Sequence, residues 1–474
     1  IEQSGSSDVG GALVQASGVQ LEGGVPSGAG VYLQGLGSQR VLILLDGQPM
    51  VGRLNGNFDL SRLPSSAVDR IEVVRGPQST LYGSDAMGGV INVITRAPTD
   101  GLALSLAALG GTQGRREANA SVSGTRGRLG VMLDAGARGE SLAPGLPGDD
   151  GTFARRWQAA TKVHWSLGGS ALQASGLVVG EAQRYRTGQL YHFSDNTQMA
   201  GRLGWIWQHG AHRLAPTLSV SRFDHFSRAS TGAQPASDSG QRDVQQLVQG
   251  EVTGSLPVPG GIADLGIQLR HESIRADRVR GVSRSLNGLE TWAQGTWSLG
   301  PLSVTPGLRL ALLEQWGSSI TPRLAALLRA SPAVAFRGSV GVGYRAPDFK
   351  ELYLDFANPA AGYAVAGNPG LRPEHSRNVS LGVELVGSAL FGRVSAYHNR
   401  FTNFIDFGPP DAGGTYRYTN VGRGMTRGVE AEAGWANGRS RIEAGYAFLD
   451  ARDEANQAPL LGRARRSTRA SAST

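Results

Sequence analysis

From about residue 99 onward, the chain is built from segments of roughly ten residues in which apolar and polar side chains alternate. In residues 155–166, for example, Trp157 and Trp165 share one face and Gln158 and His164 share the other. Glycine, proline, serine or asparagine turns separate these segments, and no helical pattern intervenes. This texture favours many antiparallel strands closed into a large barrel, because closure removes exposed strand edges.

Two kinds of fold show such alternation. In a transmembrane barrel the two faces of each strand contact lipid and lumen, whereas in a soluble sandwich or propeller the apolar face is the core. No run approaches the 18 or so apolar residues of a membrane-spanning helix, which excludes a helical membrane protein. A mean hydropathy of −0.19 is compatible with a barrel. At about ten residues per crossing we expect about 16–18 strands. The expected long loops are residues 139–154, 180–197, 227–242 and 277–286.

The first hundred residues have a different pattern of apolar and polar residues. Short apolar runs rich in β-branched residues occupy 41–45, 71–74 and 90–94, and glycine turns accompany each run. Runs this short, bounded by turn residues, predict buried strands rather than helices. Ser7 or Asp8 can cap a short preceding helix. Together these elements predict a compact α+β domain.

Residues 31–98 closely resemble the plug domain of TonB-dependent outer-membrane receptors. The matching pieces are LQGLGSQRVLILLDG at 33–47 and RIEVVRGPQSTLYGSDAMGGVINVITR at 70–96. The resemblance implies a plug, residues 1–98, seated inside a transmembrane antiparallel β-barrel, residues 99–474, in the bacterial outer membrane. That family's barrel has about 22 strands, so we expect an incomplete barrel here, with C-terminal strands missing. The plug motif residues are Arg75, Gly76, Tyr82, Gly83, Gly88 and Gly89.

In function, the resemblance implies capture and energised import of a scarce metal chelate, namely a ferric siderophore, haem or cobalamin. The implied partners are TonB with ExbB and ExbD, together with lipopolysaccharide and other outer-membrane lipids. The short segment that contacts TonB in the family is not in this sequence, and both ends of the chain look cut. A passive porin or a surface adhesin is the alternative function.

A second match covers residues 341–374. Tyr344-Arg345-Ala346-Pro347 and the later NPGLRPE at 368–374 resemble a motif pair best known in haem uptake. The interval between them contains no histidine and His375 lies just outside, which leaves haem, cobalamin and ferric siderophores all open. Its two tyrosines are the plausible iron-binding side chains, and by position in the family the plug loop 48–57 touches the ligand. The predicted ligand-binding residues are Gln48, Pro49, Arg53, Asn55, Asn57, Tyr353 and Tyr363.

Charges in or beside the strands of the N-terminal domain, such as Arg70, Glu72, Arg75 and Arg96, have two interpretations. They form structural ion pairs or face a polar wall, or they hold the plug until it is pulled. The net charge of +8 comes from arginines dispersed along the chain. Nucleic-acid binding needs basic residues clustered on one element, so no nucleic-acid partner is predicted.

Several catalytic and metal chemistries are excluded. The chain has no cysteine, its eight histidines are scattered, and no HExxH pattern occurs, so neither a metal site nor a cofactor is predicted. Asp149 and Asp150 alone fall far short of the oxygen ligands that calcium requires. The sequence around Ser84 lacks the G-x-S-x-G elbow, and no phosphate-binding loop follows the nearby glycines. We therefore expect no enzymatic activity.

Overall fold

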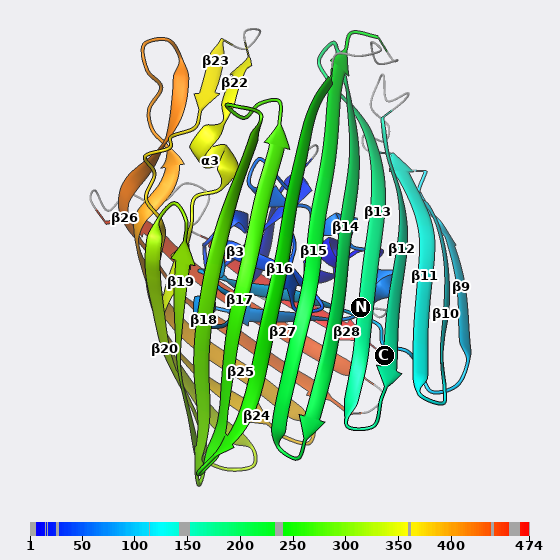
Figure 1. The fold of residues 1–474 in the computed structure, drawn as a ribbon, viewed down its shortest axis with the longest axis vertical. Helices are drawn as coiled ribbons and strands as arrows, with labels where there is room; N and C mark the ends of the chain where they lie inside the picture. Colours follow the sequence, from blue (N-terminus) through cyan, green and yellow to red (C-terminus); the bar gives the residue numbers. More distant parts are fainter. Residues whose placement is uncertain are drawn as a thin grey trace.

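The structure, a computed structural model, describes residues 6–14, 16, 18–24, 28–112, 114–141, 152–232, 240–358, 362–437, 440–454 and 465–473. An N-terminal domain lies inside a large β-barrel, whose long tilted strands surround it (Figure 1). Among these residues, no helix is long and apolar enough to cross a membrane.

The N-terminal domain is organised around a four-stranded sheet in the order β4-β3-β8-β7. β3 and β8 are parallel, and β7 pairs with β8 in the antiparallel sense. The three apolar runs expected to form strands lie within β3, β7 and β8. The elements of the sheet are β3 (Val41–Leu45), β4 (Gln48–Pro49), β7 (Val68–Arg75) and β8 (Gly89–Thr95).

Small elements pack around this sheet. The expected short helix is α1 (Val9–Leu13), capped by Asp8, which accepts a hydrogen bond of 2.8 Å from the amide of Gly11. Fully buried apolar side chains, among them Val31, Phe58 and Ile91, form the core of the domain. The other elements are β1 (Val19–Gly24), β2 (Gly28–Leu33), η2 (Ser38–Arg40), β5 (Arg53–Leu54), β6 (Asn57–Phe58), η3 (Leu60–Arg62), η4 (Ser65–Ala67) and α2 (Ser79–Tyr82).

The barrel wall contains β9–β21 and β24–β28, which is 18 strands among the described residues and lies within the expected range. The order of the strands is closed, with β28 next to β9. The first half of the wall is β9 (Ala103–Gly110), β10 (Arg116–Arg126), β11 (Leu129–Ser141), β12 (Phe153–Ser166), β13 (Ser170–Thr187), β14 (Leu190–His209), β15 (His212–Ser230), β16 (Gly240–Val258) and β17 (Gly261–Ala276). The second half is β18 (Ser283–Leu299), β19 (Leu302–Leu313), β20 (Gly317–Arg329), β21 (Val334–Arg345), β24 (Glu374–Val386), β25 (Leu390–Phe407), β26 (Thr415–Ala436), β27 (Arg441–Asp453) and β28 (Arg465–Ser473).

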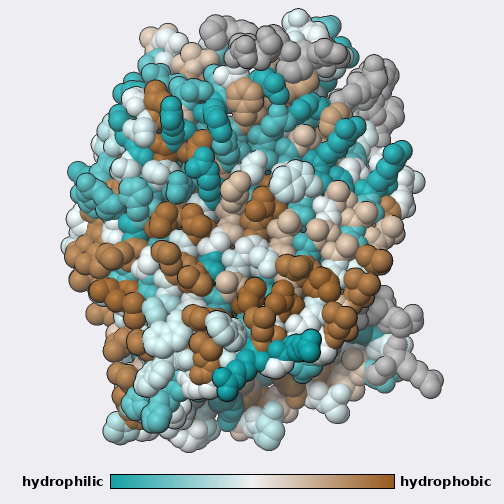
Figure 2. Space-filling model, turned by 45° about the vertical axis from the view of Figure 1, so that its right-hand side comes forward, coloured by the Kyte–Doolittle hydropathy of each residue, from teal (hydrophilic) through white to brown (hydrophobic). Residues whose placement is uncertain are grey.

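The polarity of the wall decides between the two kinds of fold. On β12, Trp157 and Trp165 are 52% and 47% exposed on the outside, whereas Arg156 and Gln158 are buried inside. Figure 2 shows apolar side chains gathered across the middle and lower part of one face, with polar side chains above them. Apolar residues outside and polar residues inside are the arrangement of a membrane barrel, so the soluble sandwich and propeller are wrong.

One end of the barrel has short turns and the other carries longer structures. Residues 180–197, expected to form a loop, are strand instead, because β13 and β14 stay paired up to Thr187 and Leu190. The polar sequence there reflects strands that rise beyond the apolar band, which alternation alone does not separate from loops. Residues 142–151, with Asp149 and Asp150, lie outside the described residues. At the same end α3 (Phe349–Tyr353), β22 (Asp355–Asn358) and β23 (Tyr363–Ala366) fold between β21 and β24 (Figure 1).

Candidate functional site

Buried ion pairs join the N-terminal domain to the wall. Arg40, at the end of η2, donates to Glu374 of β24 at 2.7 Å through its Nε and at 2.5 Å through its Nη2. Its guanidinium carbon also lies 3.5 Å from the centre of the Phe404 ring. Glu374 and Arg40 are almost completely buried, so each charge depends on the other for compensation.

The motif residues of the N-terminal domain continue this contact. Arg75 lies 3.0 Å from Glu430 of β26. Gly83 has a φ of +77°, and a Cβ there would lie 2.7 Å from Glu290, so glycine permits the close approach to β18. Gly89, with a φ of +145°, lies where a Cβ would meet the Val74 carbonyl oxygen at 2.3 Å. The motif residues therefore stabilise the internal sheet and its contacts with the barrel wall.

A cavity of about 1200 Å³ lies between the N-terminal domain and the end of the barrel that carries α3. Its floor is the loop from Pro49 to Asn57 together with Tyr82 and Asp85. Its sides come from the inner faces of β13–β18 and from α3, β22 and β23. Both charged and aromatic side chains line it, so it suits a ligand of several hundred daltons with polar and flat parts.

The charged floor of the cavity is held by a pair. Arg53 donates to Asp85 at 2.8 Å, and Ser84 donates to the other oxygen of the same carboxylate, also at 2.8 Å. Burial alone would raise the pKa of Asp85, but the neighbouring Arg53 guanidinium outweighs burial and lowers that pKa. Asp85 is therefore ionised at neutral pH and keeps Arg53 fixed at the floor.

The α3 helix links the cavity to the ion pairs below. Asp348 caps the helix and Lys350 reaches across to an ion pair with Asp243 of β16. On the opposite side Glu351 accepts two hydrogen bonds from Arg345, at 3.0 and 2.9 Å, and Arg345 also donates to Glu374 at 2.8 Å. One continuous charge network thus runs from α3 through the wall to Arg40.

Five of the predicted ligand-binding residues meet at the cavity, and two do not. The five that line it are Pro49, Arg53, Asn55, Asn57 and Tyr363. Gln48 instead points to the wall, where its amide oxygen accepts a hydrogen bond of 2.9 Å from Ser219. Tyr353 donates to Gln315 at 3.4 Å and lies under Arg284, away from the cavity wall.

Sequence reasoning missed the role of the 341–374 motif. Its Arg345 and Glu374 form the buried network, and its Asn368 donates to the Tyr418 carbonyl at 3.0 Å. Arg345, Glu351 and Glu374 stand among other charged residues of the same stretch, so the sequence alone does not single them out. Among the residues that the structure describes, no group of three histidine, aspartate or glutamate side chains can hold a metal ion.

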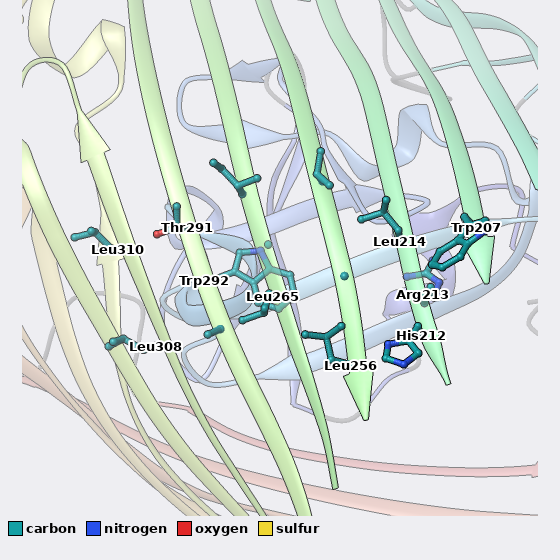
Figure 3. Close-up of a pocket in the computed structure, with 15 residues that line it drawn as sticks. Trp207, His212, Arg213, Leu214, Leu256, Leu265, Thr291, Trp292, Leu308 and Leu310 are labelled. Atoms are coloured by element: carbon teal, nitrogen blue, oxygen red, sulfur yellow. The ribbon is translucent and has the colours of Figure 1, made fainter. Parts of the chain in front are cut away.

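A second hollow lies on the outside of the barrel (Figure 3). It measures about 750 Å³ and is lined mostly by aliphatic side chains, including Leu214, Leu256, Leu265 and Leu308. These residues belong to the outward apolar rows of β15–β19, where the wall contacts lipid. The interior cavity, which combines charge with aromatic surface, is therefore the candidate site.

Family models match nearly the whole chain. Residues 1–90 match the TonB-dependent receptor plug domain, and residues 95–473 match the TonB-dependent receptor-like β-barrel. The chain belongs to the TonB-dependent receptor family. Its members are receptors of the outer membrane, and the N-terminal domain described above is the plug.

The relatives include a vitamin B12 transporter and an iron-regulated outer membrane protein. The vitamin B12 transporter BtuB of Photobacterium profundum is 24% identical over 471 residues, which cover 96% of this chain and 75% of that protein. The iron-regulated outer membrane virulence protein of Vibrio cholerae (strain O395) is 27% identical over 460 residues, covering 90% and 69%.

Solved structures show the same fold. The siderophore receptor PirA from Pseudomonas aeruginosa aligns with a TM-score of 0.78 and 18% identity, over 94% of this chain and 82% of that one. The copper transporter OprC aligns with a TM-score of 0.83 and 16% identity, over 98% and 80%. At such identities these similarities establish the fold but do not identify the ligand. The ligand has to be inferred from the side chains that line the cavity.

Proposed function

We propose that the receptor captures a scarce metal chelate or a corrinoid at the outer face and imports it with energy delivered through TonB. The observation that carries this proposal is the cavity of about 1200 Å³ whose floor is the plug itself. A ligand bound there touches both the outer hairpins and the element that must move. We place the boundary between plug and barrel after Pro98.

Ligand contact with the plug supports coupling to transport. A ligand shifts an equilibrium only by its different affinity for the two states. Arg53, Asn55 and Asn57 offer a guanidinium and two amides from the plug floor, and Tyr363 faces them from the outer hairpin. Displacement of the plug would destroy this arrangement and release the ligand inward. The energy source that we propose is TonB with ExbB and ExbD, in an outer membrane that supplies lipopolysaccharide around the barrel.

The same contacts argue against a passive porin. A porin leaves an aqueous channel through its lumen. Here Arg40 and Arg75 of the plug pair with barrel glutamates, and Arg309 of β19 donates to the Leu81 carbonyl of the plug at 3.0 Å. We propose a gated transporter without catalytic activity.

Uptake by cells tests the proposal. The protein is expressed in cells with and without TonB, and cyanocobalamin, haemin and a panel of ferric siderophores are offered. We expect uptake of one of these ligands that disappears without TonB. Uptake that is indifferent to TonB would indicate a passive pore, and surface binding without uptake would indicate an adhesin.

A further inference from the structure

Most of the basic side chains that line the cavity are neutralised by a carboxylate. Ion pairs of this kind hold the guanidinium or ammonium group in place and leave little net charge for a ligand. The pairs are Arg40 with Glu374, Arg53 with Asp85, Arg228 with Asp195, Arg242 with Asp224, Arg270 with Glu272, and Lys350 with Asp243.

Arg278 differs from these side chains. It lies in the connection between β17 and β18 and lines the cavity, yet within the described part of the chain no carboxylate comes within ion-pair distance of it. Its guanidinium carbon lies 4.4 Å from the centre of the Phe356 ring of β22. Its backbone carbonyl accepts a hydrogen bond of 2.7 Å from the amide of Asp355, which fixes the two elements together.

Aromatic rings lie on the same side of the cavity as this guanidinium. Phe356 packs edge-on against Tyr363, with ring centres 6.0 Å apart. Tyr185 stacks on His192 at 4.7 Å across the β13–β14 hairpin. Arg278 interacts electrostatically first with Asp243, whose ion pair is with Lys350, and then with Tyr363 and Tyr185. Tyr185, His192, Phe356 and Tyr363 all line the cavity. Within the described part of the chain, Phe356 therefore lies over a guanidinium that has no ion-pair partner, with Tyr185 and Tyr363 near it.

We infer that Arg278, Phe356, Tyr185 and Tyr363 form a subsite for an anionic group carried on or beside a flat ring, so that the ligand is an anionic chelate. This inference rests on the proposed function. Stacking on Phe356 occupies one face of the guanidinium and leaves its N–H edge free to donate two parallel hydrogen bonds to a carboxylate or phenolate. The rings offer stacking surface to the attached planar group.

The subsite also separates classes of ligand. Ferric complexes of aryl chelators and haem with its propionates carry negative charge beside flat rings. Cyanocobalamin is electrically neutral overall and gains little from an unpaired arginine. The chemistry of this corner of the cavity therefore favours the first two classes over the third.

Equilibrium binding to the purified full chain in detergent tests the inference. The probes are the ferric complex of 2,3-dihydroxybenzoate, haemin and cyanocobalamin, each at two salt concentrations. The test variant is Arg278→Gln, which removes the positive charge. A second variant, Arg278→Lys, keeps the charge but lacks the guanidinium that donates two parallel hydrogen bonds. Arg186→Gln is the matched control, because Arg186 also lies over a tyrosine ring, Tyr191, but outside the cavity.

We expect the unaltered receptor to bind one of the two anionic probes, and Arg278→Gln to weaken that binding about tenfold or more and to reduce its salt dependence. The affinity of Arg278→Lys for this probe should lie between those of the unaltered receptor and Arg278→Gln. Arg186→Gln should leave the affinity unchanged. Failure of both anionic probes to bind, or equal binding by Arg278→Gln in a variant that retains a folded barrel, would overturn the inference. TonB-dependent uptake of cyanocobalamin together with an unaffected Arg278→Gln variant would overturn it while leaving the proposed function intact.

Discussion

Glu374 receives hydrogen bonds from Arg40 of the plug, from Arg345 of the wall and, at 2.7 Å, from the amide of Ile405. The carboxylate is fully buried, so its charge is compensated only by these donors. A buried carboxylate with three donors is destabilising to remove, because the donors are then left without a partner.

At the scale of this residue we predict that Glu374→Gln lowers the free energy of unfolding by roughly 3–5 kcal/mol, since the buried guanidinium of Arg40 loses its counter-charge and that of Arg345 keeps only Glu351. Glu384 lies on the same strand and pairs with Arg337 at 2.8 Å, but that arginine is exposed. Glu384→Gln should therefore change stability by less than about 1 kcal/mol. Denaturant unfolding of both variants in detergent measures the difference, and equal effects would contradict a special role for the buried network.

Single residues were predicted unevenly from the sequence. Loop position in the plug located Arg53, Asn55 and Asn57, because the plug motif fixes where that loop lies. The sequence could not locate Arg278, because the environment of this residue is formed by two hairpins that meet only in the folded barrel. Tyr353 ends helix α3, and its side chain contacts Gln315 and Arg284, a direction that depends on how α3 docks and that a single sequence does not display.

At the scale of elements, the docking of helix α3 depends on the protonation of one carboxyl group, Glu351, which lies outside the membrane-spanning strands. Burial raises the pKa of Glu351 to about 7, although Arg345 opposes the shift. A pKa above the value in the unfolded chain means that docking of α3 is strongest below about pH 4.5 and weakens as the pH rises through 7.

We predict that the hydrogen-exchange protection of the α3 amides, corrected for intrinsic exchange rates, falls between about pH 5 and 8. In Glu351→Gln this pH dependence should disappear, because glutamine does not titrate. Asp348→Asn is a useful comparison, since it alters the cap of the same helix but leaves Glu351 in place. Persistence of the full pH dependence in Glu351→Gln would show that another group is responsible.

The strands of the wall make a second prediction. Leu218 lies within the outward apolar row of β15 and is 56% exposed, yet in a membrane barrel this exposure is to lipid. Leu218→Arg should therefore destabilise the barrel by roughly 2–4 kcal/mol in lipid bilayers, and Leu218→Ala by much less. Refolding titrations into vesicles measure both. An arginine tolerated as well as alanine would mean that this face contacts water.

Elements were predicted well where side-chain period alone decides. The strands of the plug and the alternating strands of the wall follow directly from apolar spacing. The tall β13–β14 hairpin was predicted as a loop, because its residues are polar on both faces once the strands leave the apolar band. The paired backbone that defines it depends on register between neighbouring strands, which a single sequence does not display.

At the scale of the whole molecule, the plug occupies the lumen and is joined to many strands of the wall at once. Arg40 contacts β24, Arg75 contacts β26, and Ser66 donates to Asp134 of β11 at 3.1 Å. Import therefore requires part of the plug to move relative to the wall. We propose that force applied through TonB breaks these contacts when the plug moves.

The measurement that tests this account most directly is uptake with the plug locked. The chain has no cysteine, so Ser66→Cys combined with Asp134→Cys introduces a single possible cross-link between plug and wall. Under oxidising conditions we expect TonB-dependent uptake to fall at least tenfold, to return after reduction, and to persist in each single-cysteine variant. Undiminished uptake by a protein shown to be fully cross-linked would contradict the requirement that this part of the plug move.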